Sequence, residues 1–264
     1  MIRRILNAYS IELTSAFRMK STYLGPVLLV IIILLTPFAY PIQEDADSDY
    51  DFLAYVLPLA INVFGLFMVL IYSATLISTD LHNGSIRMTL TQPLRRREYW
   101  AAKFLHGISY VMALNLVALG TAFGLVKLLG DFSGVYFADE LLYSDREMIQ
   151  LLLTTIGLTL LPQFAVVSYA LFFSTATRNP TTAIVLSVGS WLGLEAMKFP
   201  LQISEFVYSS YAEAPWTVFS DRCSAFTESS FYPQAYYGVG VSMIYMLVFA
   251  SVSSFILSRR NLVV

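Results

Sequence analysis

The chain has little of the charge that keeps a soluble enzyme in solution. Of its 264 residues only 13% are charged and 57% are hydrophobic, and the mean hydropathy is +0.65. Soluble globular domains carry about 25% charged residues. The shortage of charge and the surplus of apolar residues exclude a disordered chain and argue against a soluble enzyme. The composition instead indicates a protein whose natural solvent is the lipid bilayer.

Cysteine and histidine are also scarce. Cys223 is the single cysteine, and His82 and His106 are the two histidines. One cysteine excludes an internal disulfide framework and a multi-cysteine metal site, and two histidines leave little for a histidine cluster. We therefore predict no metal site. The net charge of −2 gives no global basic field, so no nucleic-acid partner is expected.

Three motifs of enzymatic chemistry are missing from the sequence. No Gly-Lys pair occurs anywhere, which excludes a phosphate-binding loop of the form GxxxxGK[ST]. The HExxH and GxSxG motifs are also absent. His106 lies near Ser109, but groups on one helix do not supply the oriented site that nucleophilic catalysis needs. We predict no catalytic residue and no cofactor in this chain, and we do not expect it to be an enzyme.

Long apolar segments, by contrast, are abundant. A helix needs roughly 20 mostly apolar residues to cross the hydrocarbon core. Six segments qualify, so we predict an all-α membrane protein that forms one domain over residues 1–264. The six transmembrane helices are expected at about 22–42, 53–78, 104–128, 149–174, 181–199 and 236–257.

The fifth predicted span, 181–199, is the weakest of the six. It is short, and it holds Glu195 and Lys198 near its end. Because these residues are three positions apart on a helix, we expect them to pair with each other.

Residues 1–20 are predicted to form an amphipathic helix rather than a cleavable signal peptide. Arginines and small polar residues lie largely on one side of this helix. The other side carries apolar residues at helical spacing, namely Ile2, Ile5, Leu6, Tyr9, Leu13 and Phe17. Such a helix lies in the membrane interface with its basic groups at the lipid phosphates. The alternative is a soluble helix that packs on another subunit.

Basic and acidic residues divide unequally between the two sides of the predicted membrane. If the N-terminus is inside, 12 of the 16 Lys and Arg residues fall in cytoplasmic segments, and 15 of the 18 acidic residues fall outside. Since Lys and Arg accumulate in cytoplasmic loops, this distribution predicts that both termini are cytoplasmic. We expect a multi-pass protein of the cell (inner) membrane, with the lipid bilayer as its surroundings.

The predicted outer segment 200–235 is rich in aromatic residues, among them Tyr208, Trp216 and Phe219. Amphipathic rings favour the headgroup zone of a membrane. We therefore predict short helices that lie in, or dip into, the outer leaflet before the last span. The alternative is an outer cap that packs on a partner subunit.

The longest inner loop, 79–103, has the features of a docking surface. Asn83-Gly84 marks a turn, and Ser85 is placed to cap a short helix. Beyond it, apolar side chains alternate with charged and polar ones, and exposed apolar groups of this kind are typical of a protein interface. The residues concerned are Ile86, Arg87, Met88 and Leu90, and Pro93 blocks continuation of the helix.

Two elements of this loop have simpler interpretations as well. Arg95, Arg96 and Arg97 precede the third span, and they would serve equally as an anchor that fixes the topology. Gly84 would serve equally as an ordinary turn glycine.

The loop resembles the segment between the second and third spans of ABC-2 type transporter permeases. That family shows an acidic residue, a Gly-Thr/Ser pair, a Leu-rich turn, a proline, a basic residue, and Gly-Lys at the start of the next span. Here Asp80 stands where Glu is common, and Ala102 replaces the frequent glycine before Lys103. The six spans, the N-terminal helix and the aromatic segment extend the resemblance over essentially the whole chain.

The resemblance implies a membrane-spanning permease subunit of an ATP-binding cassette exporter. It implies two copies of a cytoplasmic ATPase subunit, which would hold the ATP and Mg, and a second permease subunit in a homodimer or related heterodimer. The loop 79–103 would supply a coupling helix seated in the ATPase. The ATPase contacts implied are Asp80, Gly84, Ser85, Ile86, Arg87, Met88, Leu90, Pro93, Arg95 and Arg96, with Arg178 in a second contact.

Two other interpretations of the chain stay open. One is a secondary transporter or channel that works without an ATPase, although no convincing buried ion-coupling carboxylate and no internal repeat support it. The other is a membrane scaffold that transports nothing. Polar residues inside spans are functional candidates. Asn62, Asn115 and Gln163 are therefore candidates for a substrate pathway, with helix-to-helix bonding as the alternative role of the amides.

Overall fold

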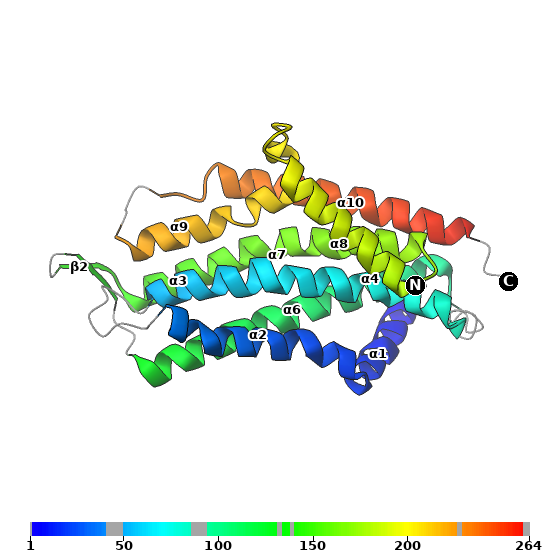
Figure 1. Ribbon diagram of the computed structural model, residues 1–264, viewed down its shortest axis with the longest axis horizontal. Helices are drawn as coiled ribbons and strands as arrows, with labels where there is room; N and C mark the ends of the chain where they lie inside the picture. Colours follow the sequence, from blue (N-terminus) through cyan, green and yellow to red (C-terminus); the bar gives the residue numbers. More distant parts are fainter. Residues whose placement is uncertain are drawn as a thin grey trace.

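The computed structural model describes residues 2–40, 50–85, 94–130, 134–137, 140–225 and 229–260. Within these ranges the chain is a helical bundle whose long helices lie side by side along the long axis (Figure 1). The prediction of an all-α membrane protein is confirmed apart from a small antiparallel hairpin, β1 (Val135–Phe137) and β2 (Glu140–Tyr143).

Among the described residues, five helices are long and apolar enough to cross a bilayer. They are α2 (Lys20–Ala39), the continuous helix Tyr50–His82, α6 (Arg96–Leu129), α7 (Asp145–Ala176) and α10 (Gln234–Arg259). Each coincides with a predicted span. Helix α8 (Pro180–Met197) stands where the fifth span was predicted, but it is only 18 residues long and is not among the five. Gly189, Gly193 and Glu195 lower its apolar character, so six spans stay a prediction.

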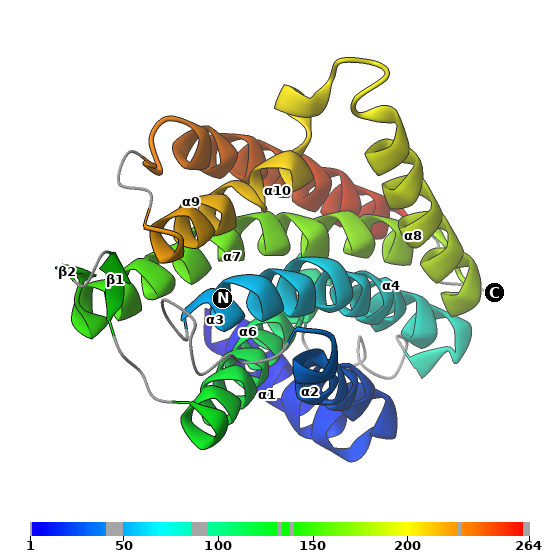
Figure 2. The same cartoon turned by 60° about the vertical axis from the view of Figure 1, so that its left-hand side comes forward.

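The bundle is organised around α7. This helix packs between α10 and the helix α4 (Leu66–His82), and α2 lies on the far side of α4 and α6 (Figure 2). Gly107 of α6 permits a close approach to α7, because a Cβ at that position would lie 2.5 Å from Cγ1 of Val167. A larger side chain there would force the two helices apart.

The second long helix changes its winding in the middle. Helix α3 (Tyr50–Pro58) passes into a π-helical stretch, η1 (Leu59–Gly65), before α4 begins. π-helical turns inside α-helices are rare and are frequently found at functional sites. Here the stretch faces the middle of the bundle, with Ile61 and Gly65 buried.

The chain between α8 and α10 packs onto the bundle. Two 3₁₀ turns, η2 (Ser204–Phe206) and η3 (Tyr208–Tyr211), lead into α9 (Ala214–Cys223). In Figure 1, α8 runs obliquely from the end where α7 finishes, and α9 continues toward the opposite end beside α10. Tyr208, Trp216 and Phe219 are buried. The predicted short helices are therefore present, whereas their depth in an outer leaflet stays a prediction.

The predicted pair of charges at the end of α8 is confirmed. Lys198 Nζ lies 2.6 Å from Glu195 Oε2, and the lysine is buried. The pair neutralises two charges that would otherwise face apolar surroundings at the end of this short helix.

The N-terminal helix α1 (Ile2–Arg18) confirms the helix predicted over 1–20. It packs on α6 at an angle to the bundle, with Ala8 and Ala16 buried. Ile2, Leu6 and Phe17 from the predicted apolar side are 72%, 52% and 61% exposed. These side chains point away from the bundle, where a bilayer would cover them. The position of α1 in a membrane interface stays a prediction.

Candidate functional site

Helix occupies both ends of the predicted inner loop 79–103. Helix α4 continues to His82, and α6 begins at Arg96. The start of α6 is fixed by Glu98, whose Oε2 accepts the backbone N–H of Arg95 at 2.9 Å. Such a contact satisfies one of the donors left free at a helix N-terminus. Helix α6 thus extends on the N-terminal side of residue 104, where the third span is predicted to begin, and the start of the membrane-crossing part stays a prediction.

A tight turn ends α4. The N–H of Asn83 bonds to the carbonyl of Thr79 at 2.9 Å, and Gly84 has φ +69°. This left-handed conformation follows many helix ends and favours glycine. The predicted turn is confirmed. Ser85 Oγ donates back to Asp80 Oδ1 at 3.1 Å, so its hydroxyl holds the turn to the preceding helix.

Of the predicted ATPase contacts, five lie outside the described residues. They are Ile86, Arg87, Met88, Leu90 and Pro93. The structure therefore describes the two ends of the loop, residues 79–85 and 94–103.

A cluster of charges joins these ends. Lys103 on α6 places its Nζ 2.7 Å from Asp80 Oδ2 on α4 and 2.7 Å from Glu12 Oε2 on α1. The hydroxyl of Tyr99 donates to the same Asp80 oxygen at 2.5 Å, and the lysine Nζ lies 5.5 Å from the centre of the Tyr99 ring. One cation therefore holds carboxylates from two other helices.

The burial of this lysine makes the cluster rigid. The Lys103 side chain is 5% exposed, whereas the Asp80 and Glu12 side chains are 23% and 20% exposed. A buried cation without its partners is strongly unfavourable, so all three groups hold one another in place. Asp80, predicted as an ATPase contact, is thus also an internal ion-pair partner. We name the set of Glu12, Asp80, Tyr99 and Lys103 the charge clamp.

Arginines cap the two helices that end beside the clamp. Nη1 of Arg96 donates to the carbonyls of Ser258 and Arg260 at 2.9 and 2.8 Å, at the end of α10. Arg260 in turn donates to the carbonyls of Thr175 and Thr177, where α7 ends. Burial, and then the charge of Arg178, lower the pKa of Arg260. Cations at helix C-termini satisfy free carbonyls and complement the helix dipole.

The remaining predicted contacts differ in accessibility. Arg96 is occupied by α10, whereas Arg95 is exposed at the start of α6 and Arg178 is exposed in the turn between α7 and α8. Of the three arginines in the described part of the predicted contact set, Arg95 and Arg178 therefore offer the more accessible surface.

The polar side of α6 continues into the bundle with His106. Its Nε2 hydrogen-bonds the Tyr72 hydroxyl at 2.7 Å, and the Tyr72 ring stacks on Tyr110 with centroids 3.9 Å apart. Ser109 bonds instead to the Tyr9 hydroxyl, at 2.6 Å. The histidine and the serine therefore have separate partners and do not form a nucleophile–base pair.

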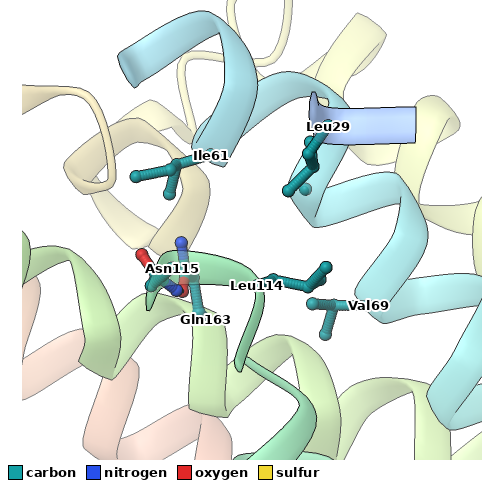
Figure 3. Close-up of a pocket in the computed structure, with 7 residues that line it drawn as sticks. Leu29, Ile61, Val69, Leu114, Asn115 and Gln163 are labelled. Atoms are coloured by element: carbon teal, nitrogen blue, oxygen red, sulfur yellow. The ribbon is translucent and has the colours of Figure 1, made fainter. Parts of the chain in front are cut away.

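Two of the three predicted pathway residues meet in the middle of the bundle. Asn115 Nδ2 donates to Gln163 Oε1 at 2.6 Å and to the Val111 carbonyl at 2.9 Å, with both amides buried. Figure 3 shows them together at one side of a cavity that Leu29, Ile61 and Val69 help to line. Asn62 is not part of this pair, because its Nδ2 donates to the Ala212 carbonyl before α9, at 3.1 Å.

The cavity is small. Its volume of about 10 Å³ gives room for roughly one water molecule. Asn115 Oδ1 is buried and has no hydrogen-bond partner among the described residues, so the polar wall has an acceptor for such a water. In this conformation the amide pair bonds α6 to α7, and the role of these residues in a substrate pathway stays a prediction.

Glu12, Tyr99 and Lys103 had not been predicted as site residues. The sequence does carry signals for them: Glu12 is the single acid on the N-terminal helix, and Lys103 opens an apolar span. The alignment of α1, α4 and α6 that joins them is a property of the fold. In the described ranges, no three His, Cys, Asp or Glu side chains gather as a metal site.

Comparison with known families matches residues 6–262 to a single model, described as ABC-2 family transporter protein. The match covers nearly the whole chain. The chain belongs to the ABC-2 transporter family. This confirms the resemblance seen in the sequence, and it makes the protein a permease of an ABC-type transporter and a multi-pass membrane protein. Membership implies association with an ABC ATPase. No curated protein matches the chain.

Replacing Lys103 tests how much the charge clamp contributes to the stability of the protein. We expect Lys103→Met to lower the free energy of unfolding by about 3 kcal/mol, because two carboxylates lose their counter-charge. Unfolding in detergent micelles, followed by tryptophan fluorescence, measures the change. Lys127→Met, at the exposed far end of the same helix, is the matched control and should cost less than about 0.5 kcal/mol. Equal losses in the two variants would contradict the clamp.

Because Asn115 and Gln163 bond to each other, we expect the effects of replacing them on the free energy of unfolding to be non-additive. Asn115→Leu and Gln163→Leu should each cost about 1 kcal/mol, because each leaves a buried amide without its partner. The double variant should cost less than the sum of the two. Asn62→Leu serves as the control, since its bond goes to Ala212, and it should be additive with Gln163→Leu within about 0.5 kcal/mol. Additivity of the first pair, measured in the same unfolding assay, would exclude the pairing.

Proposed function

We propose that the chain is the permease subunit of an ATP-driven exporter. A separate cytoplasmic ATPase would hydrolyse ATP, and two permease subunits would enclose the pathway. Family membership supports the transporter class and the ATPase partner. The charge clamp is the observation that supports mechanical coupling, because it ties both ends of the inner loop to a third helix.

The clamp would transmit force from the loop to the bundle. A push on residues 86–93 acts at one end on α4, through Gly84 and Ser85, and at the other on α6. Since Lys103 ties Asp80 to Glu12, the two helices and α1 would move as one body. Asn115 lies further along α6, the helix that carries Lys103. Its contact with Gln163 of α7 would open or close as α6 tilts.

The energy for this motion would come from unequal binding. The ATPase must hold the loop differently in its ATP-bound and ATP-free states, because a partner with equal affinity for two conformations shifts neither. Closure of an ATPase dimer would bring the two loops of a permease pair together and rock the bundles about their contact. Substrate would leave toward the outer side.

Charge distribution supports an inward-facing loop. Arg3, Arg95 and Arg178 are all exposed and lie on elements at the bundle end where the loop begins and ends. At the opposite end, near the β1–β2 hairpin, Glu140 and Glu147 are exposed. Basic residues mark the cytoplasmic side. Both termini would therefore be cytoplasmic.

The orientation gives a labelling prediction. Cys223 is the single cysteine, so a Cys223→Ser variant supplies a cysteine-free background. Asn83→Cys in this background should react with a membrane-impermeant maleimide only in inside-out vesicles. Leu142→Cys, exposed on β2, should react only in right-side-out vesicles. The reverse pattern would place the loop on the outer side of the membrane, where a cytoplasmic ATPase could not contact it.

The docking role predicts a loss of ATPase association. Ile86→Glu should lower recovery of the ATPase with the tagged permease about tenfold, because a buried charge replaces an apolar contact. Leu142→Glu makes the same change at the opposite end and should leave recovery unchanged. Normal membrane levels of both variants would show intact insertion.

Two results would contradict the proposal. One is unchanged ATPase recovery with Ile86→Glu. The other is substrate flux by the purified chain in liposomes without any ATPase, driven by a proton or sodium gradient, which would make the protein a secondary transporter or channel.

A further inference from the structure

A second cavity lies at the bundle end opposite the charge clamp. It has a volume of about 310 Å³, is open on one side, and is lined by the first turns of α7, the last turns of α9 and residues 229–231. This volume is at the lower end of the range for small-molecule sites. The walls carry one basic and one acidic residue, Arg222 and Glu147, over an apolar floor.

The guanidinium of Arg222 is held in a fixed position. It donates to the Tyr143 hydroxyl and, from Nη2, to the Ser229 carbonyl at 2.8 Å, and it lies 5.3 Å from the centre of the Tyr143 ring. A guanidinium has five N–H donors in a rigid fork. These contacts orient the fork, and the other N–H groups can bind an anion in the cavity. Planar forks of this kind suit phosphate.

The carboxylate of Glu147 is positioned just as firmly. Its Oε2 accepts from the backbone N–H and from the hydroxyl of Ser144, each at 2.9 Å, at the start of α7. Among the described residues no basic group lies within 4.0 Å of this carboxylate, so it does not pair with Arg222. Two opposite charges therefore line one cavity without neutralising each other.

The floor between the charges is apolar. Met148 is 1% exposed, and Leu151, Val218 and Phe231 complete the surface. A ligand that matches the whole cavity carries an anionic group, a cationic group and a hydrophobic part. The two unpaired wall charges favour such a ligand over one with a single charge.

The depth of the cavity indicates where such a ligand comes from. Helix α7 has 32 residues and is therefore about 48 Å long, against about 30 Å for the hydrocarbon core. Its ends project roughly 9 Å beyond the core if it is centred. Glu147 is the third residue of the helix and Leu151 the seventh, so the charged wall lies at headgroup level and the floor at the start of the core.

We propose that this cavity binds the headgroup of an aminophospholipid, with the phosphate at Arg222 and the primary ammonium at Glu147. The acyl chains would leave along Leu151 and Phe231 into the bilayer. The site is separate from the clamp and from the inner loop, and its test involves neither ATPase nor transport. The inference therefore stands or falls independently of the proposed function.

Lipid binding by the delipidated full chain tests the site. Native mass spectrometry in detergent measures the retention of dioleoyl phosphatidylethanolamine and dioleoyl phosphatidylglycerol, which share a phosphate but differ in the ammonium. The wild-type chain should bind the first about tenfold more tightly. Glu147→Gln should abolish this preference, and Arg222→Gln should weaken both lipids about tenfold.

Matched variants separate the site from general charge effects. Arg146→Gln and Glu140→Gln change exposed charges at the same bundle end but outside the cavity, and they should bind both lipids like the wild-type chain. Because Arg222 also supports Tyr143 and Ser229, Arg222→Lys is the second variant at this position. It keeps the charge, loses the fork, and should bind less tightly than wild type while its thermal unfolding in detergent stays close to it.

Three outcomes would overturn the proposal. The first is equal affinity of the wild-type chain for the two lipids. The second is a preference for the aminophospholipid that survives Glu147→Gln in folded protein. The third is binding of soluble O-phosphoethanolamine as tight as that of the lipid, which would make the ligand a free solute rather than a membrane lipid.

Discussion

One lysine cation between two carboxylates holds three helices together at the end of the bundle where α4 finishes and α6 begins. Lys103 is almost completely buried, and it can be so only because Asp80 and Glu12 converge on it from different helices. These contacts join α1, α4 and α6 close to the turn at Gly84. The chain between α4 and α6 consequently leaves from, and returns to, helices that the charge clamp ties together.

Most of the helical architecture could be predicted from hydropathy, because the bilayer imposes a minimum length on any apolar helix. The α2, α7 and α10 segments were located in this way to within a few residues. Helix α6 begins at Arg96, before the predicted span start at 104, since a helix capped by Glu98 can extend into polar surroundings where hydropathy gives no signal. The fifth span was the uncertain one in the sequence. In the structure its place is taken by the short α8, with α9 after a break of 3₁₀ turns.

The site was less predictable, for a physical reason. Gly84 and Ser85 were singled out because a turn and a capping residue can be recognised from neighbouring residues, whereas Asp80 was singled out by the family resemblance. The structure brings Ser85 and Asp80 together at the turn. The partnership of Lys103 with Glu12 depends on how two helices are placed against each other, which no local pattern encodes. The same holds for Asn115 and Gln163, which are 48 residues apart and meet through packing, whereas Asn62 finds a backbone carbonyl elsewhere.

The two arginine caps have a consequence for biogenesis. In the proposed topology, Arg96 and Arg260 would be free cations during synthesis and would favour the cytoplasmic face while each span enters the bilayer. After folding the same guanidinium groups are bound to the carbonyls that end α10 and α7. The groups that would orient the chain in the proposed topology thus also close the bundle, so replacing either arginine would disturb both insertion and the packing of the last two long helices.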